Sequence, residues 1–171
     1  MVEANLIVSY DPSHAGSAKQ EVENVLKEIK HNFKHLKQDI DGLFNLRVKD
    51  ARKTVKSLAK LCGKKPEFFE KTFHWTPIDK WCKSTVKDMQ NAVKKFEKDI
   101  KKTEKWKMEL DKKHHKGGDT IELILKLTEA VNKPKVDLEK PEKIIKVEIV
   151  GNKAGLALLK ADELLNTIKA K

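Results

Sequence analysis

Hydrophobic positions recur along the first half of the chain with two periods, and these predict alternating strands and helices. An apolar residue at every third or fourth position predicts a helix with one buried face, whereas short apolar runs beside Gly, Pro or Asp predict strands. The predicted order is β-α-β-β-α-β, the order of a ferredoxin-like unit. The expected elements are a strand at 6–10, a helix from Ser17 to Phe33, strands at 36–43 and 44–48 around Asp41-Gly42, a helix over 51–62 ended by Gly63, and a strand at 73–78.

The second half of the chain predicts a helix, a strand, a helix, two strands and a closing helix. Thr85 and Asp88 resemble a capping box, and Asp119 is expected to cap the second helix. A strand, a helix and a further strand can form a right-handed crossover around a small sheet. The expected elements are a helix over 85–100, a strand at 105–110, a helix over 119–131, strands at 145–149 and 154–159 around Gly151-Asn152, and a helix over 161–168. We therefore expect an α/β (α+β) chain of two domains, 1–82 and 83–171.

The 171-residue chain is strongly basic, with 37 Lys and Arg against 26 Asp and Glu and a formal net charge of +11. Residues 49–71 carry 8 basic and 3 acidic side chains, and residues 94–116 carry 10 and 5, so these stretches supply +10 of that charge. Such a charge favours a polyanionic partner, with RNA, DNA and an anionic membrane as candidates. The alternative is the solvated, lysine-rich surface of a heat-adapted protein. Two separate basic stretches favour an electrostatic footprint for a phosphate backbone.

Motifs for catalysis or cofactor binding are absent from the sequence. The one Gly-Gly pair is not a Walker or Rossmann fingerprint, and no G-x-S-x-G elbow occurs. His31 and His35 have the spacing of zinc ligands on a helix, but the Glu of H-E-x-x-H is missing, and Cys62 and Cys82 are too few for a four-thiolate site. We therefore expect a binding module with no cofactor and no metal, not an enzyme. No apolar run could span a bilayer and no secretory leader is recognisable, so we expect a soluble, cytoplasmic protein.

Two clusters of cationic side chains are the candidate RNA-binding residues. Alternation in the strand at 105–110 places its lysines opposite Trp106 and Met108, and a basic loop then leads to a helix N-terminus at Asp119. The alternative is a solvated lysine face followed by a mobile loop. The candidates are Lys105, Lys107, Lys112, Lys113, His114, His115 and Lys116 in the second domain, and Arg52, Lys53, Lys56, Lys60, Lys64 and Lys65 in the first.

Two tryptophans near the domain boundary have two possible roles. Trp75 and Trp81 flank Pro77, and aromatic side chains of this kind can stack on unpaired RNA bases. We favour the other role, in which both pack between the two halves of the chain. Alternation places Trp106 in the core.

Several segments together resemble a THUMP domain. They are Lys105-Trp106-Lys107-Met108-Glu109-Leu110, the basic loop 112–116, the helix capped by Asp119, Val136-Asp137-Leu138-Glu139-Lys140-Pro141, and the strand and glycine turn at 145–151. The preceding βαββαβ unit is similar to the N-terminal ferredoxin-like domain that accompanies THUMP domains in tRNA-modifying enzymes. Residues 72–79 resemble the segment that leads from one domain to the other.

The resemblance implies a role in tRNA modification. In that family the two domains grip tRNA through its acceptor stem and CCA end, and most members add a catalytic domain. A chain without one is similar to the stand-alone archaeal and eukaryotic adaptors that present tRNA to a separate RNA cytidine acetyltransferase, which forms N4-acetylcytidine. A targeting subunit for another tRNA-modifying enzyme and a general structured-RNA binder stay open as alternatives. Lys112 and Lys113 stand where THUMP loops often carry Arg, and Lys lacks the planar fork for bidentate contacts.

Overall fold

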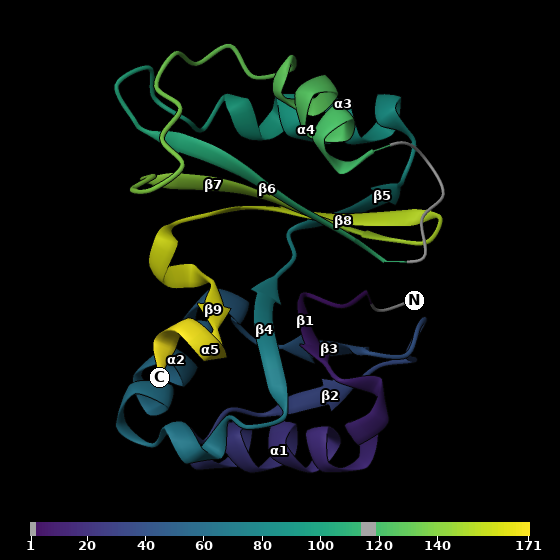
Figure 1. Cartoon of the computed structure of the whole chain (residues 1–171), viewed down its shortest axis with the longest axis vertical. Helices are drawn as coiled ribbons and strands as arrows, with labels where there is room; N and C mark the ends of the chain where they lie inside the picture. Colours follow the sequence, from purple (N-terminus) through teal and green to yellow (C-terminus); the bar gives the residue numbers. More distant parts are fainter. Residues whose placement is uncertain (1–2, 114–118) are drawn as a thin grey trace. The chain divides into compact units, whose positions relative to one another are not determined.

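The computed structural model describes residues 3–113 and 119–171, and Figure 1 labels their helices and strands. The chain divides into two compact units. The first unit comprises residues 1–78 with 162–171, and the second comprises residues 79–161. The first compact unit thus ends at Ile78, four residues before the expected boundary, and the last ten residues belong to it as well.

The first unit has the ferredoxin-like order that the sequence predicts. Its sheet runs β2-β3-β1-β4-β9 with antiparallel neighbours throughout. The elements are β1 (Leu6–Tyr10), α1 (Ala15–Glu28), β2 (Phe33–His35), β3 (Leu43–Val48), α2 (Ala51–Lys64), β4 (Thr72–Pro77), β9 (Leu165–Asn166) and α5 (Thr167–Ala170), with 3-10 helices at Pro12–His14, Pro66–Phe68 and Ala161–Glu163.

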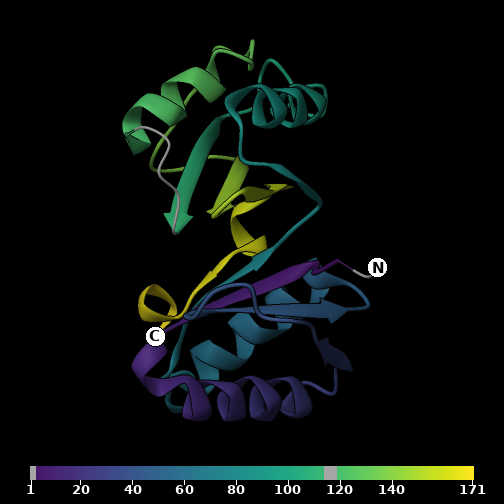
Figure 2. The same cartoon turned by 90° about the vertical axis from the view of Figure 1, so that its right-hand side faces the viewer.

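One apolar core joins the two long helices of the first unit to one face of its sheet (Figure 2). Alternation along β1 directs Leu6, Val8 and Tyr10 into this core. Val22 from α1 and Leu58 from α2 meet them there, and all five side chains are at most 3% exposed. The two helices thus cover the same face, which leaves their polar sides on the surface of the unit.

The second unit is a four-stranded sheet with two helices. The sheet runs β5-β8-β7-β6, in which only the β6–β7 pair is parallel, as the predicted crossover requires. Thr85 caps α3 by accepting the N–H of Asp88 (3.2 Å), and Asp119 caps α4, so both predicted caps are confirmed. The elements are β5 (Lys80–Lys83), α3 (Val86–Glu97), β6 (Trp106–Lys113), α4 (Thr120–Thr128), β7 (Lys143–Val150) and β8 (Lys153–Leu159).

Four local predictions are wrong in the first unit. Lys30 adopts a positive φ of 60° after α1, which ends the helix, so Phe33 begins a strand and the expected strand at 36–43 is mostly loop. Helix α1 begins at Ala15, after a 3-10 turn capped by Asp11, and Ser17 lies inside it. Gly63 lies within α2, which ends before a proline.

The expected closing helix over 161–168 is also wrong. Its apolar spacing is compatible with a helix, but the segment forms a 3-10 turn, β9 and the short α5. Leu165 is buried in the first core, and β9 adds to the edge of β4 through the pair Trp75 and Leu165. The Thr167 hydroxyl donates to the carbonyl of Thr72 (2.6 Å), which fixes the end of the chain to the same strand. Strand pairing and hydrogen bonds with residues distant in sequence thus decide the structure of this segment, although its local apolar spacing is compatible with a helix.

Strand β5 is the element that sequence patterning misses. Its four residues, Lys80 to Lys83, show no apolar alternation, and they become a strand by pairing with β8. Across the described ranges, 3–113 and 119–171, no helix has the length and apolar character needed to cross a bilayer.

Candidate nucleic-acid interface

Helix α2 carries a line of three exposed lysines, Lys53, Lys60 and Lys64, which we call the α2 stripe. At about 100° per residue these positions fall within about 20° of one line along the helix. The stripe extends for roughly 16 Å. None of the three forms an ion pair with a described residue. The stripe is therefore a row of uncompensated positive charge on one face.

The other predicted cations of α2 have protein partners. Arg52 lies 3.6 Å from Glu163, and Lys56 lies 3.7 Å from the same carboxylate. Lys65 pairs with Glu28 at 3.5 Å and sits over the ring of Phe68. These contacts hold the C-terminal segment and α1 against α2, so less of this charge is left for an external anion.

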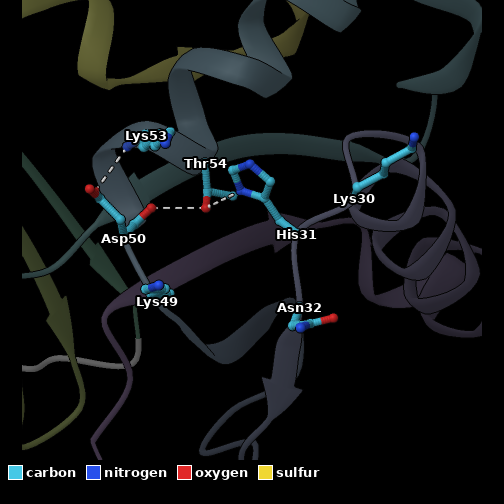
Figure 3. A pocket seen from close by; sticks show the side chains of 7 residues that line it. All are labelled: Lys30, His31, Asn32, Lys49, Asp50, Lys53 and Thr54. Carbon is cyan, nitrogen blue, oxygen red and sulfur yellow. Dashed lines mark hydrogen bonds between the residues drawn. The ribbon is translucent and has the colours of Figure 1, made fainter.

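A pocket lies at the start of the α2 stripe, where Lys53 belongs to both (Figure 3). It has a volume of about 220 Å³. One wall is the segment between α1 and β2, and the other is the junction of β3 with α2. The lining residues are Lys30, His31, Asn32, Lys49, Asp50, Lys53 and Thr54. The pocket was not evident from the sequence, because the turn at Lys30 brings segments about 20 positions apart together.

Hydrogen bonds orient the imidazole of His31 in this pocket. The Thr54 hydroxyl donates to the carbonyl of Asp50 (2.9 Å), a bond from a helical residue to the carbonyl four positions earlier. A hydroxyl has one proton to donate, so the contact between Thr54 Oγ1 and His31 Nδ1 (2.9 Å) requires the ring to donate from Nδ1. The second ring nitrogen, Nε2, is left without a partner among the described residues.

Asp50 is the only acidic residue among the described residues that line the pocket, and its carboxylate caps the N-terminus of α2. Its carboxylate accepts the backbone N–H of Lys53 (3.1 Å), which makes it the N-cap of the helix. Three lysines against one aspartate leave the lining with a formal charge of +2.

The alternation predicted for β6 is confirmed, but its lysines are paired. Trp106 and Met108 are buried in the second core, while Lys107 lies on the opposite face of the strand. Lys107 forms a short ion pair with Glu109 (2.6 Å). Lys105 pairs with Asp137 at 3.7 Å. This side of β6 is therefore a mixed-charge surface instead of an uninterrupted lysine face.

A buried ionic network continues from β6 to β7. Lys146 lies 2.5 Å from Asp111, 3.4 Å from Glu148 and 3.7 Å from Glu109. Burial favours the neutral acid and raises the pKa of Glu148 to about 7, although Lys146 acts in the other direction. Burial alone would lower the pKa of Lys146, but Glu148 and the other carboxylates outweigh it and the pKa is raised. Lys146 is surrounded by carboxylates that neutralise its charge, so the network has a structural role.

The remaining candidates of the second unit lie at the end of β6. Lys112 and Lys113 are still part of the strand, paired with Ile149 and Val150 of β7, and both are half-buried. His114, His115 and Lys116 fall outside the described residues. The RNA-binding role of the basic loop therefore stays a prediction.

A lysine cluster between β5 and α3 was not among the candidates. Lys80 lies close to Lys95, and the interaction between their side chains, mainly the repulsion of like charges, lowers the pKa of Lys95, with smaller contributions from burial and Lys98. Two adjacent ammonium groups favour an anion between them. The basic run of α3 was visible in the sequence, but Lys80 joins it only through the pairing of β5 with β8.

The tryptophan and histidine predictions are corrected by the structure. Trp75 is fully buried in the core of the first unit, where its Nε1–H donates to Thr72 (3.1 Å), so it has neither the favoured role of packing between the halves nor the alternative role of base stacking. Trp81 is half-buried, with Lys153 over its ring at 4.6 Å. His31 and His35 lie in a loop and on β2 and do not share a helix. Within the described part of the chain, no group of three or more His, Cys, Asp or Glu residues is arranged to hold a metal.

The sheet and helices of the second unit correspond to a known domain. Residues 83–159 match the THUMP domain family. This segment of the chain is therefore similar in sequence to THUMP domains. The match spans α3 to β8, and it includes the segments at 105–151 whose sequence resembles a THUMP domain. A search of curated protein sequences finds no match to the chain.

Solved structures share the fold over nearly the whole chain. PH1313 from Pyrococcus horikoshii has a TM-score of 0.64 at 13% identity, over 94% of this chain and 54% of that one. TrmN from Thermus thermophilus has a TM-score of 0.58 at 13% identity, over 90% and 44%. A 4-thiouridine synthetase, solved with RNA and bound ATP, has a TM-score of 0.51 at 16% identity, over 96% and 42%. The chain thus spans about half the length of these proteins.

Proposed function

We propose that the protein is a non-catalytic, cytoplasmic tRNA-binding adaptor. It binds the acceptor stem and CCA end of tRNA and presents the tRNA to a separate RNA cytidine acetyltransferase, which forms N4-acetylcytidine. The observation that carries this proposal is the THUMP domain at residues 83–159, preceded by a ferredoxin-like unit with uncompensated lysines. The absence of catalytic motifs from the sequence supports the non-catalytic role.

Two measurements test the tRNA part of the proposal. Binding of the purified chain to mature tRNA should be tighter than binding to the same tRNA without its CCA end, because the acceptor end is the proposed contact. Equal affinities would remove the acceptor-end assignment. Charge reversal at Lys112 and Lys113 should weaken binding to both RNAs if the end of β6 contacts the phosphate backbone.

The acetylation part needs the partner enzyme. Nucleoside analysis of tRNA from a strain lacking this gene should show loss of N4-acetylcytidine. In vitro, the purified chain should raise the acetylation of tRNA by the purified acetyltransferase. The chain alone, incubated with tRNA and acetyl-coenzyme A or S-adenosylmethionine, should produce no modified nucleoside; a product there would overturn the non-catalytic role.

A targeting subunit for another tRNA-modifying enzyme is the second candidate. The shared fold with TrmN and with a 4-thiouridine synthetase supports this second candidate. Co-purification from the native source separates the two candidates, because it identifies the catalytic protein that accompanies the chain.

A further inference from the structure

The pocket at the start of α2 has positive charges that the protein itself does not use. Lys30, Lys49 and Lys53 are exposed, and none forms an ion pair with a described residue. This differs from Arg52 and Lys56 nearby, whose charges are matched by carboxylates. Cations that line one pocket repel each other, and an anion bound among them reduces that repulsion.

His31 supplies a directional group to the same cavity. Figure 3 shows its ring between Lys30 on one side and Asp50 with Lys53 on the other. Because Nδ1 donates to Thr54, the ring is held in one orientation and Nε2 has no partner among the described residues. In the protonated ring Nε2 is a hydrogen-bond donor, so an anion at this position favours the protonated form.

The size of the cavity fits a small anion with part of its hydration shell. Its volume of about 220 Å³ has room for several water molecules at roughly 30 Å³ each. The N-terminal amide groups of α2 are not proposed as contacts for the anion, because the Asp50 carboxylate already accepts one of them. The side chains of two separate chain segments would provide the contacts.

Lys53 also begins the α2 stripe, so the pocket continues into a row of unpaired lysines that ends at Lys64. A linear polyanion can contact the pocket and the α2 stripe at the same time, whereas a free phosphate ion can contact only one of them. We propose that the pocket binds a backbone phosphate of RNA, held by Lys30, Lys49, Lys53 and protonated His31, with the neighbouring phosphates along the α2 stripe. This deepens the proposed tRNA binding and rests on it.

The first test compares variants in tRNA binding. Lys49→Gln should weaken binding several-fold and reduce the slope of log affinity against log salt by about 1, as expected for a lost phosphate contact. Lys19→Gln, at an exposed position on α1, removes the same charge outside the pocket and is the matched control. Thermal unfolding of both variants checks that each remains folded. Equal effects of the two substitutions would overturn the pocket assignment while leaving tRNA binding intact.

The second test uses the histidine. Wild-type affinity for tRNA should increase as the pH falls from about 8 to 6, and His31→Gln should remove most of that increase. The other charged groups that line the pocket with the ring are Lys30, Lys49, Asp50 and Lys53. An unchanged pH dependence in His31→Gln would contradict the proposal.

Inorganic phosphate separates failure of the pocket from failure of the proposed function. Titration with phosphate should shift the ring resonances of His31 in NMR spectra, and Lys49→Gln should reduce the shift. No shift would overturn the anion site whatever the result with tRNA. A shift in a protein that does not bind tRNA would retain an anion site but overturn both its assignment to RNA and the proposed function.

Discussion

Glu21 shows at the residue scale how one buried side chain can organise a loop. It is 9% exposed, and its carboxylate accepts the backbone N–H groups of Glu70, Lys71 and Thr72 at 2.7–2.9 Å. These groups belong to the segment that leads into β4. A buried carboxylate is tolerated because three charge-assisted hydrogen bonds compensate its lost hydration.

Removal of this carboxylate should destabilise the protein. Glu21→Ala leaves three backbone donors without their acceptor, so the free energy of unfolding should fall by roughly 3 kcal/mol or more. Denaturant unfolding measures the change. Glu67→Ala, at an exposed position in the preceding turn, should change stability by less than about 0.5 kcal/mol. Similar losses in the two variants would contradict the role of Glu21.

Glu148 should make stability depend on pH. Its pKa of about 7 in the folded protein lies above the ordinary value of 4.5, so folding is favoured while the group is protonated. This contribution is complete below about pH 4.5 and is lost as the pH rises through 7, by up to roughly 3 kcal/mol. Glu148→Gln should therefore flatten the stability profile between about pH 5 and 7. Glu139→Gln, an exposed control, should leave the profile unchanged.

At the scale of one element, helix α2 has an apolar face that packs into the core and a polar face that carries its basic residues. Its apolar face packs into the first core, and the lysines of the α2 stripe lie on the polar side. Arg52 and Lys56 lie beside the stripe and pair with the C-terminal segment through Glu163, which is 7% exposed. The basic residues of α2 thus divide into a row of unpaired lysines and a neighbouring row that is paired with carboxylates.

Paired substitutions should separate these two edges. Lys60→Gln with Lys64→Gln should reduce tRNA affinity and leave the unfolding temperature nearly unchanged, because both side chains are exposed and unpaired. Arg52→Gln with Lys56→Gln removes the same charge, but it also removes two cations that contact the buried carboxylate of Glu163, so this double variant should unfold at a lower temperature. Binding titrations and thermal unfolding of both variants provide the comparison. If the two pairs behave alike, the division of α2 is wrong.

At the scale of the whole molecule, net charge is a poor measure of the charge available to RNA. The chain carries +11, but Lys105, Lys107 and Lys146 of the second unit are paired with carboxylates. In the first unit the α2 stripe is unpaired among the described residues. RNA binding should therefore involve far fewer phosphates than the number of lysines suggests.

Salt dependence of tRNA binding measures that number. If roughly 5 phosphates are neutralised, log affinity should fall with log salt with a slope of about −4. Fluorescence titrations over a range of salt concentrations give the slope directly. A slope near zero would show that backbone charge does not drive binding, and a slope near −10 would show that the paired lysines also take part.

Much of each unit follows from its sequence. Capping residues such as Thr85 and Asp119 act within one turn, and alternation in β6 depends only on which side of a strand faces the core, so local patterns identify both. Strand β5 and the C-terminal segment escaped prediction because their structure depends on pairing with β8 and β4. The lysines of the α2 stripe were similarly visible in the sequence, but the sequence did not show which lysines are paired with carboxylates.

The sequence alone determined the βαββαβ order, the THUMP-like segments and a basic surface, because hydrophobic period, caps and charge are local properties of the chain. Only the tertiary structure decided which cations are free. Glu163 returns from near the C-terminus to neutralise Arg52, and the turn at Lys30 places His31 against Thr54. Electrostatic pairing depends on distances of a few ångströms between residues far apart in sequence, and folding alone sets those distances.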